Sequence, residues 1–129
     1  MLTYENFFPN LLQRVASFAP IYEEHIKDND ELLSHVLMGD LTRYSIELYR
    51  AGHKRGDEAS REKLDKVLKI LDEGIQSADS NLQELISVSF LENLGQAEED
   101  YDNLRALLPP ALLKEMKALE SWRPGAPLS

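Results

Sequence analysis

The sequence predicts an all-α fold, a single-domain bundle of about six to eight short antiparallel helices around a buried central helix at residues 81–94. First, no stretch alternates apolar and polar residues over the length of a strand. Second, residues 81–94 are apolar on nearly every side of a helix, whereas a surface helix would show one apolar stripe. Third, glycine, proline and aspartate interrupt the helical patterns at short intervals, which favours short connections between antiparallel helices.

The first half of the chain contains three helical patterns. Apolar residues recur at helical spacing over residues 4–19 and 21–27, and Pro20 separates the two segments. The third pattern covers residues 31–51 and contains Gly39. It is compatible with one kinked helix or with two helices.

The second half begins with a helix expected over residues 60–77, whose outer face carries oppositely charged residues four positions apart. The buried helix at residues 81–94 follows. Ser80 and Gln83 have the spacing of a capping box, in which each side chain binds the free backbone amide of the other residue. This pair therefore marks the expected start of the central helix.

Two prolines, Pro109-Pro110, force a break between the last two expected helices, at residues 97–107 and 111–122. The folded domain is expected to span residues 1–122, a length that can bury one core without a metal or a disulfide. Residues 123–129 are rich in proline and are expected to form a flexible tail.

The composition argues against several classes of function. The chain has no cysteine, which excludes disulfides, thiolate metal sites and cysteine nucleophiles. Its net charge of −9 argues against nucleic acid as a partner, because binding a polyphosphate requires lysine and arginine. No apolar run is long enough for a membrane span, and the N-terminus lacks the basic region of a signal peptide. We therefore expect a cytoplasmic protein.

The sequence contains no motif for catalysis, for a metal or for a cofactor. The spacings of His25, His35 and His53 do not match a metal site on one helix. Ser87 and Ser89 lack the glycine-flanked elbow of serine hydrolases. The glycines stand too far apart for a phosphate-binding loop. We therefore expect no catalytic residue, no metal and no cofactor.

Acidic residues are concentrated in one part of the chain. Residues 71–105 contain nine acidic residues and one basic residue, whereas residues 51–70 carry a net charge of +2. This segment is compatible with a solvated surface that keeps the protein soluble, and also with a docking surface for a basic protein. In the second case Tyr101 would be an aromatic anchor, although its helical phase also suits the core. The expected partner-binding residues are Asp72, Glu73, Glu92, Glu98, Glu99, Asp100, Tyr101 and Asp102.

Two segments, Gly39-Asp40-Leu41-Thr42-Arg43-Tyr44 and Val88-Ser89-Phe90-Leu91-Glu92-Asn93-Leu94, resemble small all-helical bacterial proteins. In size, acidity and helical content the chain is also similar to the immunity proteins of contact-dependent and polymorphic toxin systems. This resemblance implies a non-enzymatic inhibitor that binds and neutralises a cognate toxin domain. Nuclease toxins are commonly basic, which suits an acidic inhibitor.

Two other functions stay open at the level of sequence. One is a helical scaffold or adaptor with a different partner. The other is a small enzyme, which would require polar side chains that converge on one cleft. The candidates for such a cleft are His35, Asp40, Arg43 and Glu47.

Overall fold

Every regular element is helical within residues 1–122, the part of the chain that the computed structural model describes. The α-helices are α1 (Phe7–Arg14), α2 (Ala19–Asn29), α3 (Ser34–Tyr49), α4 (Glu58–Ile75), α5 (Ser80–Ile86), α6 (Tyr101–Arg105) and α7 (Pro110–Trp122). The shorter turns are η1 (Ala16–Phe18) and η4 (Leu94–Asp100), which are 3₁₀ helices, and η2 (Arg50–Lys54) and η3 (Ser87–Leu91), which are π-helical. The all-α prediction is confirmed. The expected tail, residues 123–129, lies outside the described residues.

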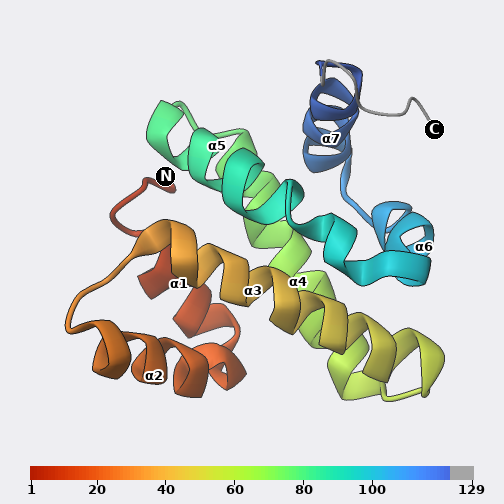
Figure 1. The fold of residues 1–129 in the computed structure, drawn as a ribbon, viewed down its shortest axis with the longest axis horizontal. Helices are drawn as coiled ribbons and strands as arrows, with labels where there is room; N and C mark the ends of the chain where they lie inside the picture. The colour runs from red at the N-terminus through yellow and green to blue at the C-terminus, as the bar shows by residue number, and fades with distance from the viewer. Residues whose placement is uncertain (123–129) are drawn as a thin grey trace.

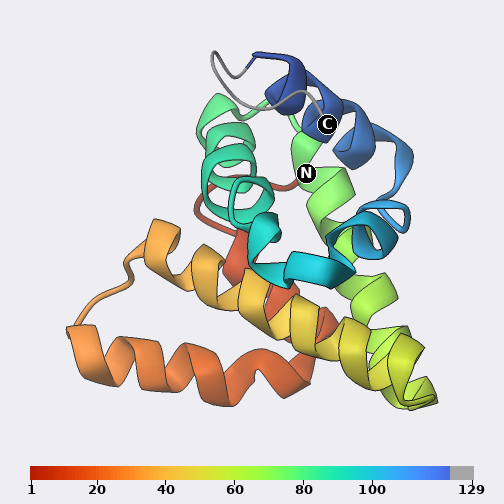
Figure 2. The same cartoon turned by 45° about the vertical axis from the view of Figure 1, so that its right-hand side comes forward.

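Helix α4 crosses the middle of the bundle and contacts α1, α3, α5 and α7 (Figures 1 and 2). Helix α3 runs beside the continuous segment formed by α5 and η3. Helix α2 lies along α3 on one side of the molecule, and α7 covers the opposite side in both views. The short elements η4 and α6 connect the end of η3 to α7.

The segment predicted as the central helix lies in the interior, but it is not one regular helix. Six of its apolar side chains are buried: Leu82, Leu85, Ile86, Phe90, Leu91 and Leu94. Helix α5 ends at Ile86 and passes into the π turn η3, which fits an extra residue into the turn. The side chain register therefore changes at this point, and Val88 is 45% exposed.

The pattern over residues 31–51 forms one helix, α3, which is continuous through Gly39. Asp30 adopts a left-handed conformation (φ 58°) that ends α2, and the backbone is extended at Leu33, so α3 begins only at Ser34. The buried Thr42 hydroxyl donates to the Met38 carbonyl oxygen (3.1 Å) and to that of Ser89 (3.3 Å). These bonds attach the middle of α3 to η3.

Asp79, and not Ser80, caps α5. Its carboxylate accepts hydrogen bonds from the backbone amides of Asn81 (2.9 Å) and Tyr4 (2.7 Å). These backbone hydrogen bonds lower the pKa of the Asp79 carboxyl group, and the bond from Tyr4 has the largest effect. The side chain of Gln83 instead donates to the Ser77 carbonyl oxygen (2.6 Å). The predicted capping box is therefore wrong, because Ser80 is the first residue of α5 and Asp79 is its cap. Asp79 also anchors the N-terminal segment.

Candidate functional site

The residues expected at a partner-binding surface lie on three parts of the fold. Asp72 and Glu73 are on α4, and Glu92 follows η3. The others lie along η4 and α6: Glu98, Glu99, Asp100, Tyr101 and Asp102. Their contacts divide them into residues that join elements of the fold and residues that face solvent.

Asp72 joins α4 to the start of α7. Its Oδ1 atom accepts a hydrogen bond from the backbone amide of Leu112 (2.8 Å), and its Oδ2 atom accepts one from Nε2 of Gln76 (2.9 Å). The Leu112 amide lies in the first turn of α7, where backbone amides have no partner within the helix. Asp72 thus supplies the cap that α7 lacks in its own sequence.

Glu73 joins α4 to α1 through Arg14. The guanidinium donates two hydrogen bonds to the carboxylate, at 2.7 Å and 3.1 Å, in the fork geometry that suits this pair. The hydrogen bonds from Arg14 lower the pKa of Glu73. The negative charge of Glu73 is therefore compensated within the molecule.

Asp100 is buried, with 6% of its side chain exposed. Its carboxylate accepts hydrogen bonds from Nε of Arg50 (3.0 Å) and Nζ of Lys54 (3.0 Å), and these two bonds lower its pKa. Arg50 also donates to the Ala97 carbonyl oxygen (3.3 Å). This cluster attaches η4 to η2, which follows directly on α3. Asp100 therefore serves the fold, and a partner could not reach its carboxylate without displacing both cations.

The remaining acidic residues of this group, Glu92, Glu98, Glu99 and Asp102, are exposed. We call these four side chains the acidic surface. Among the described residues, none forms an ion pair with Glu98, Glu99 or Asp102. The backbone of Glu98 has a positive φ of 53°, which is rare for a residue with a side chain. Such strained residues occur often at functional sites.

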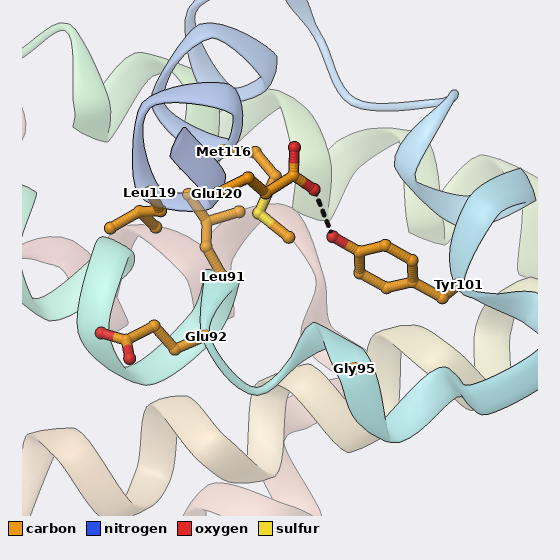
Figure 3. A pocket seen from close by; sticks show the side chains of 7 residues that line it. All are labelled: Leu91, Glu92, Gly95, Tyr101, Met116, Leu119 and Glu120. Carbon is orange, nitrogen blue, oxygen red and sulfur yellow. Dashed lines mark hydrogen bonds between the residues drawn. The ribbon is translucent and has the colours of Figure 1, made fainter. Parts of the chain in front are cut away.

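A cavity of about 170 Å³ lies beside the acidic surface, between the end of η3, η4 and α7 (Figure 3). Its lining residues are Leu91, Glu92, Gly95, Tyr101, Met116, Leu119 and Glu120. Leu91 and Met116 are buried and form the apolar floor. The Glu92 side chain points away from Tyr101 (Figure 3).

Tyr101 forms one wall of the cavity and is half-buried. Its hydroxyl donates to Oε2 of Glu120 (2.6 Å), and Arg105 donates two further bonds to the same carboxylate, at 2.9 Å and 2.6 Å. Burial and the Glu120 carboxylate raise the pKa of Tyr101 to about 12. The ring thus lies in the wall of the cavity, whereas the sequence left open whether it belongs to the core or to a surface.

Of the four polar residues considered for an enzyme, three form local ion pairs. Asp40 binds Arg43, and Glu47 binds Arg50 at 3.2 Å. His35 shares a hydrogen bond with the Ser89 hydroxyl, although the two residues lie 54 positions apart in the chain. None of these side chains lines the cavity beside the acidic surface. Among the described residues, no group of three His, Cys, Asp or Glu side chains could bind a metal ion.

The sequence of residues 8–123 matches a protein-family model described as a domain of unknown function (DUF7674). The chain belongs to this family. No curated protein and no solved structure matches it. The family description states no activity, so a proposal on function depends on the site geometry. Within the described residues, no helix has both the length and the apolar character needed to cross a membrane.

Five cavity residues were absent from the predicted partner-binding set: Leu91, Gly95, Met116, Leu119 and Glu120. The last three belong to α7, and their apolar or charged character is ordinary for an amphipathic helix. No local signal separates a residue that faces a cavity from one that faces the core. Only the position of α7 against η3 and η4 identifies them.

Proposed function

We propose that the protein binds a basic protein partner through the acidic surface and neutralises it without catalysis. The observation that carries this proposal is the contrast between the acids of residues 71–105. Glu73 and Asp100 are paired with cations inside the molecule, whereas Glu98, Glu99 and Asp102 are exposed and unpaired among the described residues. Within residues 71–105, three exposed acids without an ion pair among the described residues therefore lie close together in the chain, and Glu84 on α5 is a fourth at a separate position.

Clustered carboxylates of one sign accelerate association with a partner of opposite charge and select against acidic proteins. A nuclease domain is a suitable partner, because it must present basic residues to bind its polyphosphate substrate. The resemblance to immunity proteins supports a bacterial toxin domain as that partner, bound in the cytoplasm of the producing cell. The inhibitor would cover the active site of the toxin or an adjacent exosite.

A growth assay tests this proposal. A basic toxin domain encoded next to this gene, expressed alone, should arrest growth, and coexpression of the protein should restore it. The triple variant Glu98→Lys, Glu99→Lys and Asp102→Lys should bind the purified toxin domain at least about a hundredfold more weakly. It should also lose protection.

A matched control makes the same change of charge elsewhere. Glu23, Glu24 and Asp28 are exposed on α2, on the opposite side of the molecule from α7. Reversing these three charges should leave protection intact and change affinity only through the long-range field, which salt screens. Equal loss in both triple variants, or no loss in either, would contradict the acidic surface as the binding site.

A second candidate function, a helical scaffold or adaptor, is favoured by a different observation. Leu32, Val36 and Val88 are exposed large apolar side chains. The hydrogen bond between His35 and Ser89 brings the start of α3 and η3 together at this place. An adaptor would use these residues for an apolar contact that persists at high salt. Binding that survives high salt but is lost in Val36→Glu would favour this function.

A further inference from the structure

We infer that the cavity between η3, η4 and α7 receives one aromatic ring, carried by a basic segment of the protein partner. This inference rests on the proposed function and names the anchor that the acidic surface would orient. The cavity is a preformed depression next to exposed carboxylates, which is where an interface anchor is expected.

The size of the cavity suits a single ring. Its volume is about 170 Å³. In another protein, an engineered apolar cavity of about 150 Å³ binds benzene, whereas sites for drug-sized ligands or cofactors measure roughly 300–1,000 Å³. A phenyl group therefore matches the space, and a larger cofactor does not.

The walls of the cavity favour an apolar ring over a cation. Leu91, Met116 and Leu119 supply aliphatic carbon, and the Met116 sulfur can contact the edge of an aromatic ring. The Glu120 carboxylate at the polar end already accepts bonds from Tyr101 and Arg105. A cation placed inside would lose its hydration shell and find this carboxylate already occupied.

The charges around the cavity identify the segment that carries the ring. Tyr101 is a wall of the cavity, and the exposed Glu98, Glu99 and Asp102 are its near neighbours in the chain. Lysine or arginine residues that flank the inserted ring would lie close to these carboxylates. The apolar cavity thus adjoins exposed acidic residues of η4 and α6, and this side of it complements a basic segment with one aromatic residue.

The methionine methyl groups provide a direct test, since the chain has 3 methionines in different settings. Met116 lines the cavity, Met38 is 0% exposed in the core, and Met1 is 86% exposed. The full-length protein, ¹³C-labelled at these methyl groups, is titrated with the peptide Lys-Lys-Phe-Lys-Lys. The ring current should shift the Met116 resonance, which Met116→Leu assigns, while the Met38 resonance stays in place. The peptide Lys-Lys-Ala-Lys-Lys should bind at least about tenfold more weakly.

A variant that narrows the cavity gives a second test. Gly95 lines the cavity, and a Cβ atom added there would meet no heavy atom within 4 Å, so a side chain can be attached there without a clash at Cβ. Gly95→Leu should weaken binding of the phenylalanine peptide at least about fivefold. The control Ala59→Leu, at an exposed position of α4, should bind as the unmodified protein does.

The outcomes separate this inference from the proposed function. If both peptides bind equally, or if the Met116 resonance does not move, the ring does not enter the cavity and the inference is wrong. The acidic surface would still be tested by the growth assay. If dilution of the protein alone shifts the Met116 resonance, a second copy occupies the cavity, which also overturns the inference. The proposed function would instead be rejected if the phenylalanine peptide binds selectively while the charge-reversed triple variant still protects the cells.

Discussion

Tyr101 contributes its ring to the cavity wall and its hydroxyl proton to Glu120. Its pKa in the folded protein, about 12, lies above the ordinary value of 10.0. The folded state therefore retains this proton over a pH range in which the unfolded state has lost it. The resulting stabilisation is fully present below pH 10 and is lost as the pH rises towards 12.

This pKa leads to a prediction for Tyr101→Phe. Near-ultraviolet absorbance of the unmodified protein should show a tyrosine ionisation near pH 12 from Tyr101, and the variant should lack it. The variant should also lose about 1 kcal/mol of unfolding free energy at neutral pH, because a hydrogen bond to a carboxylate is removed. The control Tyr22→Phe should retain the late ionisation. Persistence of that ionisation in Tyr101→Phe would assign it to another residue.

At the scale of elements, the contact between α4 and α5 depends on Gly74. A Cβ atom at this position would lie 2.6 Å from Cδ1 of Ile86 and 3.4 Å from Cδ2 of Leu82. Glycine lowers the stability of a helix interior by about 1 kcal/mol relative to alanine. Its presence in α4 is explained by the close approach of α5, whose Ile86 is fully buried and must shift if a Cβ atom is added.

We predict that Gly74→Ala destabilises the protein although alanine is the better helix former. The overlap with Ile86 should cost roughly 1–3 kcal/mol, which exceeds the gain in helix propensity, because Gly74 is in the last turn of α4, where that gain is smaller than the roughly 1 kcal/mol of a helix interior. The double variant Gly74→Ala with Ile86→Val removes the overlapping Cδ1 atom. Denaturant unfolding should therefore show a favourable coupling between the two changes. Simple additivity of their effects would contradict steric overlap as the cause.

At the scale of the whole molecule, ion pairs join different elements of the fold. Arg14 and Glu73 link α1 to α4, Asp100 links η4 to η2, and Arg105 and Glu120 link α6 to α7. The cations lower the pKa values of all three carboxyl groups. Some of the protein's carboxylates thus stabilise the packing of its helices through these ion pairs.

Acid should therefore weaken the fold, and Asp100→Asn tests this statement. Because the pKa of Asp100 lies below its ordinary value of 3.8, its contribution is present above that pH and is lost as the pH falls through the folded-state pKa. At neutral pH the variant should melt several degrees lower than the unmodified protein. That difference should shrink in the acid range below pH 3.8. Asp102→Asn, at an exposed site, should melt like the unmodified protein at both pH values.

The candidate site shows what local patterns can and cannot predict. The acidic character of residues 71–105 and the prominence of Tyr101 follow directly from the residue types. The pairing of Asp100 does not, because its partners Arg50 and Lys54 lie 50 and 46 residues earlier in the chain. The same limit applies to the cavity, whose walls come from η3, η4, α6 and α7.

Periodicity and composition sufficed for the all-α class, for the interior position of residues 81–94 and for the break at Pro109-Pro110. These features depend on side chain polarity and backbone restriction, which act over a few residues. Tertiary structure alone decided which carboxylates are compensated, where the π turn changes the register of the buried segment, and that a cavity opens beside the acidic surface. Those outcomes depend on distances between segments far apart in the chain, and residue type alone does not determine such distances.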